Sequence, residues 1–400
     1  MLSRTLLVLA VALLLASAVL AANFTVNDLP RVRCVSNYLF GEGSHDVAAW
    51  ERDLDRMRAA GLNTVWMVNV WAEYEPCVEP EQWRGDLLGK LRRICAAARD
   101  RDMWVVLPLA YIGEGWGPKG IDAAVWPLIE KQRQQHLAFL RRIARQTRDF
   151  SNVFYLLCTE EILPGTLLYS PSTRPECVAS FREWARQAHP DIAYWNERWG
   201  GQSTWATLVP PDTKGRSRWQ MWADLQRWDA ALMRQMLPPM VAAVREGHPG
   251  AVVGLHDFLT PLGLDLTAAD GSLPSPNPFD FYSIGYYYDH TPKGGLAANQ
   301  AELRRRVQSV KRMYPTTPLF CGELGLDVRK APPDARAADE RLQSEFLTGA
   351  VRYLQEQKVG FSLWDWRTVV AGAARTHSLI REDGTESPVV GRLRELWRGG

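Results

Sequence analysis

The chain has 400 residues, and its 47 basic and 45 acidic residues are mixed along the sequence to give a formal net charge of +2. This balance provides no strongly cationic surface, so we expect neither nucleic acid nor an anionic membrane as a partner. The seven histidines form no HxH or HExxH pattern and the six cysteines form no CxxC pattern, so we expect no metal site and no cofactor.

The first 22 residues have the pattern of a secretory signal peptide. Arg4 precedes an apolar run at 5–15, and small residues follow around Ala18, Ala21 and Ala22. The alternative is an uncleaved N-terminal anchor, although the run is short against the roughly 20 residues that span a bilayer. We therefore expect a secreted or periplasmic protein with one folded domain at 23–400, in which disulfides are permitted.

The rest of the chain alternates short apolar runs with longer amphipathic segments. This alternation is typical of βα units around a parallel sheet. The eight predicted strands cover residues 35–41, 64–70, 103–111, 153–159, 251–256, 281–287, 319–323 and 360–364. The predicted helices cover residues 46–60, 87–100, 130–147, 219–246, 301–313, 339–357 and 389–397.

Eight strands with intervening helices predict an α/β fold, the closed (β/α)8 or TIM barrel. Residues 162–218 form an elaborated loop after the fourth strand, on the side of the barrel where its strands end. Pro238 and Pro239 are expected to kink or interrupt the helix at 219–246. Cys158 and Cys321 fall inside predicted strands and are expected to be buried thiols.

The seventh predicted strand ends in a glutamate, Glu323. A glutamate is rarely fully buried without a partner, and the carboxyl ends of barrel strands carry the reactive groups of barrel enzymes. Because side chains alternate along a strand, Glu323 points into the barrel mouth if Phe320 faces the surrounding helices. A salt bridge to an arginine of a neighbouring strand is the alternative.

Two further glutamates, Glu160 and Glu161, follow the fourth predicted strand. Alternation sends them to opposite faces, so one is expected to be catalytic and the other to support it. Two carboxylates brought together from distant strands are what the hydrolysis of a glycosidic bond requires. The 17 tryptophans agree with this chemistry, since indole rings stack on the apolar faces of sugars, although most must be core residues.

These features resemble the clan A glycoside hydrolases, (β/α)8 enzymes in which a glutamate ends strand four and another ends strand seven. The segment Gly322-Glu323, followed by Gly325, is similar to the nucleophile segment of family 5. The loop containing Phe181-Arg182-Glu183-Trp184 resembles that of family 42 β-galactosidases. The resemblance implies Glu160 as the acid/base and Glu323 as the nucleophile, with Thr159 in the place of a common asparagine.

The same resemblance covers strands six and eight. Tyr287 aligns with a tyrosine beside the nucleophile, and Trp364 with a tryptophan that commonly floors the sugar site. Other candidates for substrate binding come from the predicted positions of strand ends and of the loops that follow them. They are Asn69, Trp71, Trp116, His256 and Glu161.

The resulting hypothesis is a secreted retaining glycosidase that acts on an oligo- or polysaccharide, and the resemblance implies that the bond it cleaves is a β-linkage. A non-catalytic glycan-binding barrel is the alternative from another functional class, and a metal-dependent barrel hydrolase lacks the histidines it would need. The sequence predicts neither the sugar, nor exo or endo action, nor the oligomeric state.

Overall fold

The computed structural model describes most of the chain beyond its first 22 residues. The described residues are 23–40, 47–69, 74–75, 78, 82–83, 87–109, 120–122, 125–158, 171–211, 219–257, 278–291, 295–367 and 374–398. The predicted signal segment at 1–22 lies outside this set. Within the described part of the chain, no helix combines the length and the apolarity needed to cross a membrane.

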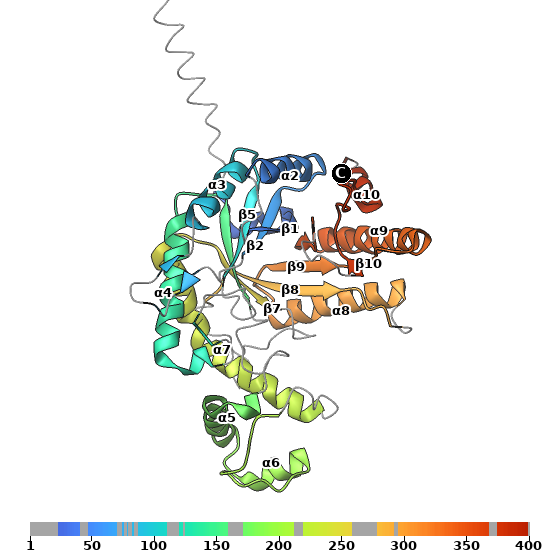
Figure 1. Ribbon diagram of the computed structural model, residues 1–400. Coiled ribbons are helices and arrows are strands. Elements are labelled where there is room, and N and C mark those ends of the chain that lie inside the picture. The colour runs from blue at the N-terminus through green and yellow to red at the C-terminus, as the bar shows by residue number, and fades with distance from the viewer. Residues whose placement is uncertain are drawn as a thin grey trace, which may run out of the picture.

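Eight parallel strands close into a barrel, which confirms the predicted fold class (Figure 1). Each strand overlaps one predicted run. The strands are β1 (Arg33–Phe40), β2 (Thr64–Asn69), β5 (Trp104–Leu109), β6 (Val153–Cys158), β7 (Val253–Asp257), β8 (Phe281–Tyr287), β9 (Leu319–Gly325) and β11 (Gly360–Leu363). Around the barrel they follow chain order, and β11 closes it against β1.

Helices surround the barrel and connect its strands. They are α2 (Val47–Ala59), α3 (Leu87–Arg99), α4 (Glu130–Thr147), α5 (Pro175–Ala188), α6 (Ile192–Trp199), α7 (Trp219–Gly247), α8 (Leu296–Met313), α9 (Pro333–Glu356) and α10 (Pro388–Arg398). Helix α7 runs through Pro238 and Pro239 without a break, so the predicted interruption is wrong. Short 3-10 helices in the described part of the chain are η1 (Val26–Arg31), η3 (Trp126–Leu128) and η4 (Pro171–Thr173).

Two small antiparallel ribbons were not predicted. The first pairs β3 (Tyr74–Glu75) with β4 (Gln82–Trp83), and the second pairs β10 (Val328–Arg329) with β12 (Arg375–Thr376). Strand β10 begins three residues after β9, and β12 follows β11. The second ribbon therefore joins the chain segments that leave two neighbouring barrel strands.

The segment between β6 and β7 contributes α5 and α6, which lie beside the first half of α7 (Figure 1). Their apolar faces form an aromatic cluster with α7. Phe181 of α5 lies 5.8 Å from the Trp199 ring of α6 and 5.5 Å from the Trp228 ring of α7. The segment therefore has a hydrophobic core of its own, built on the side of α7.

The inside of the barrel is filled by aromatic and aliphatic side chains. Phe154, Phe281 and Phe320 meet there with ring centroids about 6 Å apart. Phe24, just before η1, stacks on Phe154 at 4.0 Å and closes the end of the barrel where the strands begin. The strands finish at the opposite end of the barrel.

Four described cysteines, Cys34, Cys95, Cys177 and Cys321, are buried free thiols. The prediction for Cys321 is thereby confirmed, and burial together with the nearby Glu323 charge raises the pKa of its thiol to about 12. The side chain of Cys158 lies outside the described residues.

Candidate active site

Glu323 lies near the end of β9 with only 3% of its surface exposed. The Tyr287 hydroxyl at the end of β8 donates a hydrogen bond of 2.9 Å to Glu323 Oε2. The His256 Nε2 of β7 lies 3.3 Å from Glu323 Oε1. Three consecutive strands thus converge on one carboxylate, and each of its oxygens is held by a different side chain.

A β-bulge in β9 directs Glu323 inward. Cys321 pairs with Ile284, but the next residue of β8, Gly285, pairs with Glu323, so Gly322 is an extra residue in β9. Our premise that Phe320 faces the helices is wrong, because its ring lies among the phenylalanines inside the barrel. The extra residue shifts the alternation by one position, and the carboxylate still reaches the barrel interior.

Only glycine fits at the bulge. A Cβ atom on Gly322 would lie 2.4 Å from Ser283 Oγ, 2.8 Å from the Trp66 ring and 2.9 Å from His256 Nδ1. Each of these distances is shorter than a real carbon contact. The Gly322-Glu323 pair is therefore a geometric unit, in which the glycine lets β9 approach the side chains that surround the carboxylate.

His256 is held in one orientation by its two hydrogen bonds. An ionised carboxylate can only accept, so Nε2 carries the hydrogen that is donated to Glu323. In the neutral ring Nδ1 is then the acceptor, and the Ser283 hydroxyl lies 2.8 Å from it. His256 is fully buried, which leaves its ring no surface for contact with a substrate and makes it a support for Glu323.

Tyr287 stands between two further rings at the barrel mouth. Trp364, which follows β11, lies 6.4 Å away and edge-on. His377, which follows β12, lies 5.1 Å away. Burial lowers the pKa of His377, against the opposing effect of the Asp327 and Glu323 charges, so its ring is neutral at pH 7. Aromatic faces beside a carboxylate are suited to the apolar face of a sugar.

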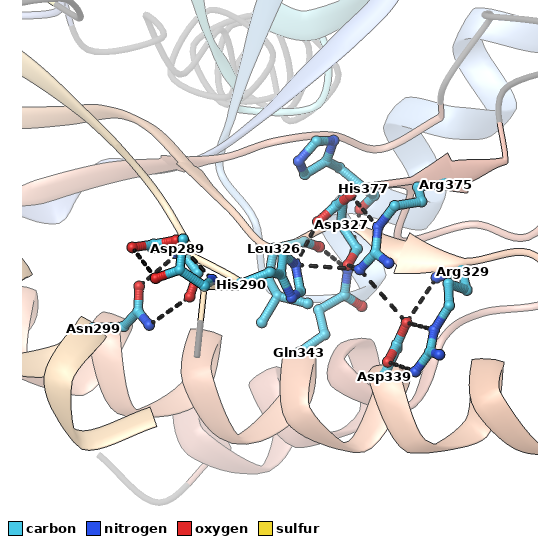
Figure 2. Close-up of polar contacts among 11 residues, drawn as sticks. Asp289, His290, Asn299, Leu326, Asp327, Arg329, Asp339, Gln343, Arg375 and His377 are labelled. Atoms are coloured by element: carbon cyan, nitrogen blue, oxygen red, sulfur yellow. Dashed lines mark hydrogen bonds and ion pairs between the residues drawn. The ribbon is translucent and has the colours of Figure 1, made fainter. Parts of the chain in front are cut away.

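An ion cluster at the β10–β12 ribbon fixes the segment that carries His377 (Figure 2). Arg375 donates to the Asp327 carboxylate and, at 3.0 Å, to the Asp327 carbonyl, and its Nη2 lies 3.6 Å from Asp339. Burial acts to raise the pKa of Asp327, but the hydrogen bond and charge of Arg375 outweigh it and hold that pKa below its usual value. His290 contacts the same carboxylate at 2.5 Å.

The structure describes some of the predicted site residues and not others. It brings Glu323, Tyr287, His256 and Trp364 together, with His256 beneath the carboxylate. The backbone of Asn69 ends β2, but its side chain is outside the described residues. The other predicted site residues also lie outside the described set: Thr159, Glu160, Glu161, Trp71 and Trp116. Glu160 is two positions beyond Cys158, the last residue of β6.

Three residues near Glu323 were not predicted from the sequence. Ser283 and Trp66 lie in the middle of strands, whereas the prediction considered residues at the ends of strands and in the loops that follow. Both side chains approach Gly322. A small polar residue inside the apolar run of β8 was the available signal for Ser283. His377 lies 14 residues after Leu363, the end of β11, and its position depends on ribbon pairing that apolar patterns do not reveal.

No protein-family model matches this sequence, and no curated protein matches it. Solved structures do match. A β-galactosidase from the haloarchaeon Halorubrum lacusprofundi aligns with 91% of this chain at a TM-score of 0.62 and 16% identity. An exo-β-1,4-mannosidase from Opitutaceae bacterium strain TAV5 aligns with 92% at 0.58 and 17% identity. A broad specificity endoglucanase from Clostridium acetobutylicum aligns with 92% at 0.56 and 13% identity.

The chain spans 57% of the length of the β-galactosidase and 59% of the mannosidase, but 96% of the endoglucanase. At these identities the similarity establishes the fold. It agrees with the resemblance found in the sequence, because the matching barrels include both β-galactosidases and cellulase-type enzymes.

Proposed function

We propose that this protein is a retaining glycoside hydrolase in which Glu323 is the nucleophile and Glu160 is the acid/base. The buried Glu323 carboxylate, held between His256 and Tyr287 near the end of β9, is the observation that carries the proposal. The names of its structural neighbours, which include a galactosidase, a mannosidase and an endoglucanase, support it.

The reaction has two steps. A Glu323 oxygen attacks the anomeric carbon as the bond to the leaving oxygen breaks, and Glu160 gives its proton to that oxygen. Glu160 then removes a proton from a water molecule, which attacks the anomeric carbon and releases Glu323. Retention requires the two carboxyl groups to lie about 5 to 5.5 Å apart. Strands β6 and β9 are parallel members of one barrel and end on the same face; Glu323 lies near the end of β9, and Glu160 comes two positions after the end of β6 in the sequence.

The partners of Glu323 suit a nucleophile. Both side chains contact the carboxylate oxygens, and hydrogen bonds to the charged form favour an ionised carboxylate. Tyr287 contacts one carboxylate oxygen and His256 the other, so the two contacts orient the carboxylate.

The direct test follows the anomeric configuration of the first product by NMR during cleavage of an aryl β-glycoside. Galactosides, glucosides and mannosides form a suitable panel. We expect a product with the substrate's configuration, and an inverted product would refute the mechanism. Glu323→Gln is expected to lower kcat at least a thousandfold, whereas Glu395→Gln on exposed α10 should leave it unchanged.

A glycan-binding barrel without activity would give another pattern. No turnover of any aryl glycoside or β-linked polysaccharide by the wild-type protein, together with measurable binding of an oligosaccharide, would favour that function over hydrolysis.

We also propose export from the cytoplasm, on the basis of the sequence pattern at 1–22. N-terminal sequencing of protein recovered from the periplasm or medium of an expression host tests this. A start near residue 22 or 23 is expected, and retention of Met1 in the cytoplasm would argue against it.

A further inference from the structure

A hollow lies on the other side of the β10–β12 ribbon from Tyr287. Its volume is about 250 Å³, at the small end for a ligand site. Its lining residues come from the ribbon, α9 and the segments after β11 and β12. They are Lys330, Arg336, Arg367, Thr376, Ser378, Ile380, Arg381 and Glu382. Four of these eight side chains are cationic, and one is acidic.

Buried carboxylates behind the hollow fix the arginines that line it. Glu340 of α9, 5% exposed, accepts from Arg381 at 2.8 and 2.7 Å and from Arg336 Nε at 3.0 Å. Asp53 of α2 accepts from Arg367 Nε and Nη2 at 2.7 and 2.9 Å. Two-pronged contacts of this kind set the plane of a guanidinium, so these groups are ordered in advance of any ligand.

The anchored arginines also have guanidinium N–H groups that can donate to a ligand. Among the described residues, the structure gives no hydrogen-bond partner to either terminal nitrogen of Arg336 or to Nη1 of Arg367. The Lys330 ammonium contacts Glu382 at 2.7 Å, but Glu382 is 80% exposed, so solvent screens this pair and a ligand can displace it. These cations face the carboxylates of Asp53, Glu340 and Glu382, and the charge of Asp383 also acts on Arg381 and Arg336. A ligand is therefore held by the unused N–H donors of the arginines and not by an excess of positive charge.

The hollow is separated from the candidate active site by one strand. Thr376 and Ser378 line the hollow, and their hydroxyl groups are 2.9 Å apart. His377, between them in the sequence, packs on the opposite side against Tyr287, which holds Glu323. His377 therefore contacts Tyr287 while its two neighbours in the chain, Thr376 and Ser378, line the hollow.

We propose that this hollow binds the oxyanion of an acidic sugar residue, either the carboxylate of a uronic acid or a sulfate ester, carried by the polysaccharide substrate. The substrate part of this assignment rests on the proposed hydrolase function. The anion site itself does not, because it can be measured by binding alone.

Calorimetric titration of the full-length protein with sodium glucuronate, inorganic sulfate and neutral glucose tests the site. We expect saturable binding of at least one anion and none of glucose at the same concentrations. Preference for glucuronate or for sulfate identifies the kind of anion. Arg336→Gln and Lys330→Gln should each weaken binding about tenfold, as expected for the loss of a charge-assisted contact. No saturable binding of either anion would overturn the proposal.

Arg141→Gln is the matched control, because Arg141 also forms an ion pair, with Glu246, but on α4 and α7. An equal loss of affinity in this control would mean a general charge effect and would overturn the site. On a glycosidase assay, Arg336→Gln should raise KM for an acidic oligosaccharide and leave a neutral aryl glycoside unchanged. Anion binding without any hydrolysis would retain the site while rejecting the hydrolase function.

Discussion

Two adjacent tyrosines at the end of β8 allow the contact to Glu323 to be tested at the scale of single residues. The Tyr287 hydroxyl donates to Glu323, whereas the Tyr286 hydroxyl points to the other face and donates to Asn299 at 2.8 Å. We expect Tyr287→Phe to lower kcat about 10- to 100-fold, because a hydrogen bond to a charged group contributes roughly 1.5 to 3 kcal/mol. Steady-state kinetics on an aryl glycoside measures this, and KM should change little.

Tyr286→Phe removes a more deeply buried hydroxyl that does not contact Glu323. We expect its kcat to stay within about twofold of the wild type, with a small loss of stability. Equal kinetic losses in the two variants would show that packing of β8, and not the contact to Glu323, determines activity.

Residues at strand ends could be found from the sequence, and residues elsewhere could not. Glu323, His256 and Tyr287 each lie at or next to the last residue of an apolar run, and parallel strands bring such ends together. The role of His256 was less accessible. Its position beneath the carboxylate depends on side-chain packing against Ser283 and Trp66, which no local pattern encodes.

At the scale of elements, the bulge in β9 gives a prediction about Gly322. Gly322→Ala places a methyl group within 3 Å of Ser283, Trp66 and His256. We expect a loss of about 1 to 3 kcal/mol in the free energy of unfolding, which is typical of overpacking, and a loss of activity as Glu323 shifts. Urea unfolding and the aryl glycosidase assay measure the two effects.

Gly391 of α10 is the matched control, because no atom lies within 4 Å of the Cβ that alanine would add there. Gly391→Ala should be neutral or stabilising by up to about 1 kcal/mol, as alanine favours a helix. If Gly322→Ala is as stable and active as this control, β9 does not require the bulge.

The ribbon's attachment to α9 gives a second prediction at this scale. Hydrogen bonds from Arg329 lower the pKa of Asp339 from 3.8 to about 2. The unfolded chain therefore takes up this proton at a higher pH, so the stabilisation is complete above about pH 4 and disappears as the pH falls to 2. Asp339→Asn should cost on the order of 1 kcal/mol at pH 7. Urea unfolding should show this difference shrinking towards pH 3, and a difference independent of pH would contradict the assignment.

The helices and strands that bury the most apolar surface were the ones that the sequence predicted best. All eight barrel strands coincide with apolar runs because both of their faces are covered, and every residue of β9 is buried. The ribbon of β10 and β12 has two residues in each strand, and it pairs Val328 with Thr376 and Arg329 with Arg375, which are far apart in the sequence. Strands of two residues are too short to show an alternation of apolar and polar side chains. The β9 bulge also has no signature, since a glycine in a strand permits a bulge without requiring one.

At the scale of the whole molecule, acid sensitivity is expected from His136, which is fully buried between α4 and η3. Its ring lies 4.4 Å from Trp126 and 6.1 Å from Phe139, and neither ring nitrogen has a hydrogen-bond partner among the described residues. Burial lowers its pKa from 6.5 to about 3. Between these values the unfolded chain binds a proton that the folded chain rejects, so stability falls as the pH falls through this window.

Two replacements of His136 distinguish the effect of its titration on stability from the effect of its size and polarity. His136→Phe fills the space between two aromatic rings and cannot titrate, so its free energy of unfolding should decline less from pH 7 to pH 4. One group contributes at most about 1.4 kcal/mol per pH unit to this slope. His136→Gln also cannot titrate but keeps a buried polar group, so it should be less stable at pH 7 with the same flattened slope. Urea unfolding at half-unit pH intervals measures both quantities, and a wild-type slope in both variants would assign the acid sensitivity to other groups.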